Sequence, residues 1–594
     1  MKAMIVERPV PLNRRVRVSD DSDPPLEPGR KKRKTPKVKT GCYSCRKRRV
    51  KCDEKRPNCH RCNRCGIVCE GYPAGVRFAK ELAPISRPLA PNPQSPLPPY
   101  SRTISPISPI SPLTISSRFE DEQQGLFFRK YMETATHIRG PIATSLWERL
   151  IPQSCEAEPY IRHAAVAVGA MSKTLAGMRL ERDELHSAIL SQNPDYVYAL
   201  SQYDKALSGM RHAMGEGRAN MRNAIFACLL VFCFENMNGR PALAAANAIS
   251  GLVLFYDFLR KTKDKRAPGW IKREFEKRHI EDDLQSTLIA LDLHVIFIMN
   301  PKVDAFNEIY IAGSDSAISK MPAEFPSLKI ARHFWMVIMG RNHHFLQGVV
   351  KAGWALASVK PEAHDEGGPC EEGTDVSPGI HLFSMLEQPP MHMFDDMLRY
   401  REHIRRWSRA SASLFNRISK SGTQVDKTAV LLLQINESLA HAMLAGAFCS
   451  TQSAYDEFLP EYQQIIDGVE LVYPHLVEAY NGEPLYRFDL GIIMALFFVG
   501  SRCRDRKIRD RAAHFLNRNK DYREGMWDTG SVGAIVNFII EVEEEKRDQY
   551  GEIAEEDKVS VAKGHLDIPN RTGLIKLSSK KKQGIAYIER AISW

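Results

Sequence analysis

The stretch Cys42–Cys69 constrains this chain more than any other part of its sequence. It consists of two halves that share the spacing C-x2-C-x6-C and are separated by six residues. The cysteines are Cys42, Cys45 and Cys52 in the first half and Cys59, Cys62 and Cys69 in the second. Because both halves repeat the same cysteine spacing, we expect their thiols to serve one kind of site.

Three kinds of site use cysteines so closely spaced: buried thiols, disulfides and metal centres. Buried thiols sit on apolar faces, whereas here the neighbours are Arg, Lys, Asp and Asn. Disulfides need an oxidising compartment, and the opening MKAMIVERPV lacks the apolar core of a signal peptide. Paired C-x2-C units are the usual thiolate chelate of structural tetrahedral zinc, so we expect zinc.

The number of thiolates predicts how the zinc is held. Two tetrahedral ions need eight ligand positions, and six thiolates fill them only if two thiolates bridge. Cys42 and Cys59, the first cysteine of each half, are the equivalent places for the bridges. Cys65 forms another C-x2-C with Cys62, but only Cys69 preserves the x6 spacing, so we interpret Cys65 as a bystander thiol.

The basic residues predict the partner of this site. Residues 30–51 carry twelve Lys and Arg and no acid, and the whole chain has a net charge of +12. The basicity is therefore one local patch, which is the footprint of a polyanion. A solvated charge run or a nuclear import signal would suit Lys31–Lys34, but not a run held between zinc ligands.

The stretch resembles the fungal Zn(II)2Cys6 binuclear zinc-cluster domain of transcription regulators. Besides the cysteine spacing, the matching residues are Gly41, Arg46, the run Arg48–Asp53, Pro57 and Glu70–Tyr72. The resemblance implies two Zn²⁺ per chain and a short helix after each C-x2 unit, the two related by pseudo-two-fold symmetry. It also implies that the first helix enters the major groove of double-stranded DNA.

The same resemblance implies roles for the basic residues. It places base reading of CGG-like triplets at Arg48 and Arg49, and leaves Arg46, Lys47 and Lys51 to hold phosphates. A nuclear, sequence-specific regulator of RNA polymerase II genes is the function that follows, with transcription machinery or co-regulators as further partners.

The composition along the chain divides it into segments. We expect a disordered N-terminus over 1–29, a basic arm with a nuclear localisation role over 30–40, and the DNA-binding domain over 41–72. A Pro/Ser-rich linker over 73–118 follows, then a large all-α domain over 119–545. A C-terminal tail over 546–594 completes the chain, with a small hairpin as the strand structure expected there.

The periodic spacing of apolar residues predicts the helices of the large domain. Ile161, Ala164, Ala165, Val168 and Met171 fall on one face of a helix that begins at Pro159. Ala224–Phe234 is apolar nearly all round and predicts a buried helix, paired through a short turn with a helix over Ala242–Leu259. Further helical patterns cover Asp395–Ile418, Ala429–Phe448, Leu490–Val499 and Ala534–Glu545. The longest apolar runs fall short of the roughly 20 residues that span a bilayer, so no membrane anchor is expected.

This region also resembles the fungal-specific regulatory domain found downstream of many such clusters. The pieces that carry this resemblance are Leu146–Trp147, Glu158–Ala164, Cys503–Asp505 and Arg523–Asp528. The resemblance implies an all-helical domain with a regulatory, non-catalytic role.

We found no catalytic motif in the helical region, so no catalytic residues are assigned. His343 and His344 are adjacent and cannot share a helix face, and Cys228 and Cys233 favour core packing over redox chemistry. The glutamates of Glu541–Glu545 are read as a solvated helix end, with an acidic activation surface as the alternative.

The competing functions are an RNA-binding zinc protein and a nucleic-acid-binding protein whose helical domain carries enzymatic or ligand-sensing activity.

Proline decides how the chain can assemble. Eleven prolines fall within residues 73–112, and each removes a backbone donor and clashes with the preceding helical turn. A coiled coil needs several uninterrupted heptads, so none can follow the cluster directly. The chain therefore binds DNA as a monomer or forms a homodimer through 119–545.

Overall fold

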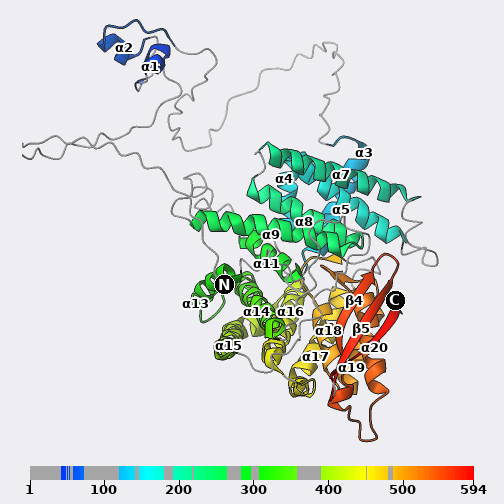
Figure 1. Ribbon diagram of the computed structural model, residues 1–594. Coiled ribbons are helices and arrows are strands. Elements are labelled where there is room, and N and C mark those ends of the chain that lie inside the picture. The colour runs from blue at the N-terminus through cyan, green and yellow to red at the C-terminus, as the bar shows by residue number, and fades with distance from the viewer. Residues whose placement is uncertain are drawn as a thin grey trace, which may run out of the picture. The chain divides into compact units, whose positions relative to one another are not determined.

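A computed structural model describes two units of this chain, Met1–Ile110 and Ser111–Trp594 (Figure 1). The described residues are 42–48, 50, 52–53, 58–71, 119–140, 146–178, 192–216, 220–263, 282–295, 307–356, 390–449, 451–478, 486–582 and 584–594. The predicted N-terminal disorder, basic arm and linker lie outside them, as do Arg49 and Lys51.

The first unit holds two short helices, α1 (Tyr43–Lys47) and α2 (His60–Arg64). Each begins directly after the first cysteine of its half, and the thiol of that cysteine accepts a hydrogen bond from the backbone N–H of the second. The helices are too short to be stable alone, so the cysteine cluster between them must hold them in place.

The second unit is largely helical, as predicted, and contains two hydrophobic cores. The first core lies among α3 (Glu122–Ile138), a π-helical turn (Leu146–Leu150), α4 (Ile151–Ala157), α5 (Pro159–Met178), α7 (Pro194–Gly215), α8 (Met221–Met237), α9 (Pro241–Lys263) and α11 (Asp282–Val295). The second lies among α13 (Asn307–Ser319), α14 (Leu328–Leu356), α15 (Met391–Ser421), α16 (Gln424–Ala445), α17 (Leu459–Leu476), α18 (Ile493–Arg502), α19 (Arg506–Arg518) and α20 (Thr529–Glu544). Short 3-10 turns cover Gly446–Phe448, Ser453–Phe458 and Glu555–Asp557.

Helix α11 joins the two cores, because Leu288 and Leu291 face the first and Ile289 and Leu293 face the second. The predicted apolar face of α5 is confirmed, since all five residues named for it are at most 1% exposed. The predicted buried helix and its antiparallel partner are confirmed as α8 and α9.

Helix α16 and the turn after it, Gln424–Phe448, form a segment long and apolar enough to cross a membrane by length and composition. Within the fold, 72% of its most apolar window is buried. That burial is what a central helix of a folded domain shows, and α16 packs between α15 and α17.

Two small sheets complete the second unit. In the first, β1 (Tyr486–Arg487) pairs in parallel with β2 (Arg523–Glu524), which forms a hairpin with β3 (Trp527–Asp528). In the second, β4 (Ser560–Asp567), β5 (Thr572–Lys581) and β6 (Gly584–Ser593) form an antiparallel meander. The strand structure expected at the C-terminus is thus three strands rather than a hairpin, and the sheet packs against α20.

Candidate metal centre and DNA interface

The six cysteines of the duplicated stretch gather into two groups of four. One group is Cys42, Cys45, Cys52 and Cys59; the other is Cys42, Cys59, Cys62 and Cys69. The sulfur atoms of each group lie within 4.8 Å of one another. Cys42 and Cys59 belong to both groups, which is the arrangement needed for the bridging positions predicted from the ligand count.

The sulfur separations fit tetrahedral zinc rather than disulfides. The Cys42 and Cys59 sulfurs are 3.6 Å apart, those of Cys45 and Cys59 3.7 Å, and those of Cys42 and Cys62 3.8 Å. A disulfide would bring the sulfurs to about 2.05 Å. Zinc–sulfur bonds of about 2.3 Å at the corners of a tetrahedron place ligand sulfurs about 3.8 Å apart.

The two halves repeat each other in their backbone hydrogen bonds. The N–H of Cys42 donates to the Cys52 sulfur and the N–H of Cys59 to the Cys69 sulfur, both at 3.5 Å. The N–H of Cys45 donates to Cys42 at 3.4 Å, and that of Cys62 to Cys59 at 3.3 Å. A shift of 17 residues converts each bond of the first half into one of the second, so the two halves are equivalent, as the resemblance implies.

Polar side chains lock the two halves together. The Ser44 hydroxyl donates to the backbone oxygen of Val68 at 3.0 Å and accepts from the N–H of Glu70 at 2.9 Å. In the other direction, the Asp53 carboxylate accepts from the backbone N–H groups of His60 and Arg61 at the start of α2. These bonds orient α1 and α2 relative to the sulfur cluster.

Burial makes this cluster dependent on cations. Cys42, Cys45, Cys59 and Cys62 are fully buried, and burial raises the pKa of the Cys42 thiol to about 12. Burial raises the pKa of Cys59 as well. The backbone N–H bonds described above are weak compensation for this burial, whereas divalent ions displace the thiol protons and bind the thiolates strongly.

Three of the predicted DNA-contacting residues are described, and they lie at the end of α1. Arg46 and Lys47 occupy the last turn of α1, Arg48 caps its C-terminus, and all three are exposed. Positive side chains at this end also face the negative pole of the helix. The bystander thiol Cys65 is exposed and belongs to neither sulfur group, while Cys69 belongs to one.

In the second unit, the residues weighed as alternative sites form structural contacts. His344 Nε2 lies 2.7 Å from the Asp292 carboxylate, and His343 Nδ1 lies 2.8 Å from the Met339 carbonyl oxygen, so the adjacent histidines face different partners. Cys228 and Cys233 are buried in the first core, as expected for core packing.

The reading of Glu541–Glu545 as a solvated helix end is wrong for one member. Glu543 has no exposed surface and binds Arg504 at 2.7 Å and Arg509 at 2.5 Å. The sequence gives no hint of this, because both arginines come from a distant segment of the chain.

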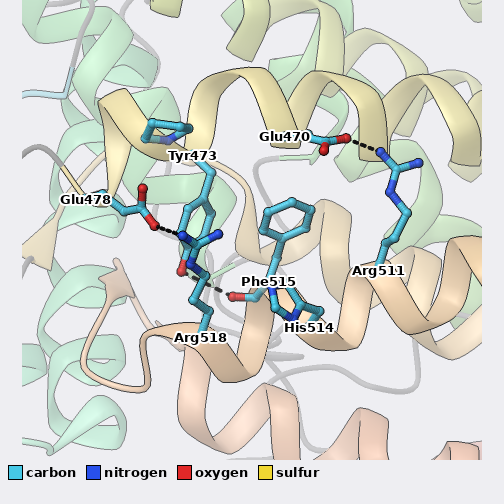
Figure 2. A pocket seen from close by; sticks show the side chains of 8 residues that line it. Glu470, Tyr473, Glu478, Arg511, His514, Phe515 and Arg518 are labelled. Atoms are coloured by element: carbon cyan, nitrogen blue, oxygen red, sulfur yellow. Dashed lines mark hydrogen bonds and ion pairs between the residues drawn. The ribbon is translucent and has the colours of Figure 1, made fainter.

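A half-open groove of about 320 Å³ lies between α17 and α19 (Figure 2). Tyr473, His514 and Phe515 line the groove together with charged side chains that form ion pairs. Arg511 binds Glu470 and Asp467, and Arg518 binds Glu478. These ion pairs connect α19 to α17 and to Glu478 just beyond it, so paired charges border the groove.

Comparisons with known proteins agree with the cluster geometry. Residues 40–77 match the family model of the fungal Zn(2)-Cys(6) binuclear cluster domain. The chain is 23% identical over 570 residues to the aspercryptin biosynthesis cluster-specific transcription regulator atnN of Emericella nidulans, covering 83% of this chain and 85% of that protein. The match therefore extends well beyond the cluster.

Shorter matches concern other fungal regulators. The chain is 25% identical to the transcription regulator lscL of Purpureocillium lilacinum over 36% of this chain and 47% of that protein. It is 49% identical over 74 residues to the Zn(2)-C6 fungal-type transcription factor afumD of Aspergillus fumigatus, covering 11% and 20% of the two chains. No solved structure matches.

These relatives are transcription regulators rather than enzymes, and the match to atnN runs through the helical unit as well as the cluster. The cluster geometry and the matching family model agree that the six cysteines bind two zinc ions. The chain is thus a DNA-binding protein that belongs to the fungal Zn2Cys6 zinc-cluster transcription regulators.

Proposed function

We propose that this regulator reads CGG-like triplets in the major groove with Arg48 and Arg49, while Arg46, Lys47 and Lys51 hold the DNA backbone. The observation that carries the proposal is the exposed basic end of α1, a helix that begins directly after Cys42 and contains Cys45, both members of the sulfur groups. In this proposal all six cysteines of the two sulfur groups ligate zinc, and Cys42 and Cys59 bridge the ions.

The chemistry of arginine supports this division of labour. A guanidinium donates two parallel hydrogen bonds to O6 and N7 of guanine, which no other base pair can accept in the same geometry. Lysine acts as a point charge and suits phosphates. Arg48 lies at the C-terminal end of α1, where the chain leaves the helix.

The α2 side provides a matched control. Arg64 lies 17 residues after Lys47, at the equivalent position of the second half, and is exposed on α2. The equivalents of Arg48 and Arg49 are Cys65 and Gly66, which cannot read guanine. Only the first half thus carries a base-reading pair.

The test measures binding to a CGG site and to each of its single-base variants. Arg48→Ala and Arg49→Ala should each cost about 1–3 kcal/mol on CGG and flatten the preference at one position. Lys47→Ala should weaken every sequence alike and reduce the salt dependence, and Arg64→Ala should change little. Equal weakening of all sequences by Arg48→Ala and Arg49→Ala would count against base reading.

We further propose a nuclear location, action on RNA polymerase II genes, and assembly through the second unit as a homodimer that recruits co-regulators. Full-length similarity to a transcription regulator supports the first two. Assembly through the second unit is supported by the proline content of residues 73–112, which excludes a coiled coil next to the cluster.

A further inference from the structure

Strand β6 exposes an apolar margin at the end of the C-terminal sheet. In the order β4-β5-β6, β5 is its only neighbour among the described residues, so its outer edge is unpaired. Ile585 is 62% exposed, Tyr587 55% and Ile588 41%. A free edge presents a row of backbone N–H and C=O groups that can pair with another strand.

The two edges of this sheet differ in how they are protected. The β4 edge has a β-bulge between Val561 and Lys563, a device that discourages strand addition. The pairing of β6 with β5 runs without a shift from Gly584 to Ser593, so β6 is a regular ten-residue strand. An edge strand of this length and regularity is a template for another strand.

The charges on β6 do not shield its edge. The Arg590 guanidinium lies 4.3 Å from the ring centre of Phe538 and pairs with Glu541, both on α20. Glu589 stands opposite Lys576 of β5 in the pairing register. The guanidinium of Arg590 is thus engaged within the chain, and along the edge the three exposed apolar residues outnumber the one remaining charged residue, Glu589.

The position of Ile588 shows that the second hydrophobic core extends to the edge strand β6. It lies directly opposite Leu577, which is fully buried, so both point to the face that packs on α20. Ile588 remains 41% exposed because nothing among the described residues covers its outer side. A residue on the core face with an open flank is what a neighbouring strand would bury.

We propose that β6 pairs antiparallel with β6 of a second copy of this chain, across a two-fold axis at Ile588, to make one six-stranded sheet. This inference rests on the proposed assembly through the second unit, and it identifies the edge of β6 as the surface through which the two copies bind. An isologous contact of this kind closes after two copies.

The register follows from complementarity. With the axis at Ile588, the two Ile588 side chains face each other, and Ile585 of one copy lies opposite Ala591 of the other. Within that other copy, Ala591 pairs with Leu574, which is 46% exposed, so Ile585 gains a second apolar neighbour. Glu589 then lies opposite Tyr587 of the second copy, whose ring carries the Lys576 ammonium 4.4 Å from its centre.

Neighbouring registers are poorer. A shift of the axis to Glu589 sets two carboxylates face to face and Ile588 against Arg590. A shift to Tyr587 sets Ile585 against Glu589. Like charges directly opposite each other destabilise a strand pair, so charge and apolar complementarity select the Ile588 register.

The test uses the full zinc-loaded chain in sedimentation velocity over about 1–100 µM. The wild type should form a dimer, and Ile588→Lys should shift it to the monomer mass because two ammonium groups meet on the axis. Leu471→Lys on α17 is the matched control, since Leu471 is 61% exposed and lies on a helix. Its dimer should be unchanged, and thermal unfolding should show that all three proteins are folded.

Cysteine cross-linking tests the register. Opposite residues in a strand pair have Cβ atoms about 4.5–5.5 Å apart, so Ile588→Cys should give a covalent dimer on mild oxidation. Ile585→Cys should not, because Ala591 faces it. The unsubstituted chain supplies the background of its own thiols.

A monomeric wild type, a dimer unaffected by Ile588→Lys, or stronger cross-linking by Ile585→Cys would overturn the interface. Binding of a single CGG triplet is measured on the same preparations and should survive Ile588→Lys. Loss of triplet preference with intact dimerisation would count against the proposed DNA reading alone.

Discussion

The Glu524 carboxylate accepts a 2.8 Å hydrogen bond from the backbone N–H of Ile492, 32 residues earlier in the chain. It also accepts from the N–H groups of Gly491 and Ile493, at 3.1 and 2.9 Å, and so caps the start of α18. The Tyr522 hydroxyl donates to it at 2.6 Å. Glu524 is 1% exposed, so no water can replace these bonds.

We therefore predict that Glu524→Gln destabilises the second unit. The amide keeps the size of the side chain but replaces one acceptor oxygen with a donor that faces other donors. An unsatisfied buried group costs about 1–3 kcal/mol, and a lower midpoint of thermal unfolding would report it. Glu545→Gln, at an exposed position on the end of α20, is the control and should leave the midpoint unchanged. Equal midpoints for both variants would contradict the capping role.

A second prediction concerns acid stability. Burial acts to raise the pKa of Glu543, but Arg504 and Arg509 outweigh it and the pKa is lowered below its usual value. The stability that this carboxylate contributes is therefore fully present above its unfolded-state pKa of about 4.3 and is lost as pH falls further. Glu543→Gln should unfold more easily at pH 7 and lose less stability between pH 6 and pH 3 than the wild type.

The measurement is the thermal midpoint of both proteins across this pH range. Removal of one partner from a buried ion pair costs about 3–5 kcal/mol, because the arginines are left without compensation. Glu541→Gln is the control: Glu541 is 59% exposed in its pair with Arg590, so its loss should change the midpoint little at any pH. Parallel curves for wild type and Glu543→Gln would rule out this role for Glu543.

The metal centre leads to a third prediction. Besides its cysteines, the cluster stretch has little apolar surface, and Val50 packs only partly against the cysteines. We therefore expect zinc binding to supply the free energy that folds this stretch. A chelator should release two zinc ions per chain, measured by elemental analysis, and abolish DNA binding. The helical signal of the second unit should persist, since its cores contain no part of the cluster. One zinc ion per chain would contradict the shared-sulfur arrangement.

The sequence predicted the zinc cluster and most long helices because both leave periodic signals. Cysteine spacing predicted the six thiols of the cluster and the two that its halves share, and apolar spacing marked α5, α8 and α9. It missed β1, β2 and β3 because strands of two residues show no alternation. It underestimated the C-terminal sheet because β6 carries apolar residues on both faces and lacks the polar–apolar alternation of a half-buried strand.

The segment Arg523–Asp528 was recognised only by resemblance, and the structure now gives its physical role. Its turn contains Gly525 at φ +54°, where a Cβ atom would lie 2.1 Å from the His294 ring. Arg523 donates to the backbone oxygens of Asn236 and Met237 at the end of α8, and Asp528 caps α20. Such long-range contacts hold the two cores together, and no local pattern in a sequence reveals them.

The fourth prediction concerns how the regulator reads paired triplets. From the prolines between Pro73 and Pro112 we predict that no rigid zipper next to the cluster fixes the spacing of two DNA-binding units. A fragment that ends at Ser117 should sediment as a monomer and bind one triplet weakly. The full chain should bind two triplets more tightly than one, and a change of a few base pairs between them should alter that affinity little.

A series of DNA duplexes with increasing spacing between two triplets provides the measurement. If the second copy is held through β6, Ile588→Lys should bind every duplex of the series as weakly as the monomeric fragment does. Leu471→Lys should behave as the wild type. A stable dimer of the fragment, or a sharp optimum at one spacing, would show that residues 73–117 fix the geometry after all, because only a stiff connection next to the cluster can impose one distance on the DNA.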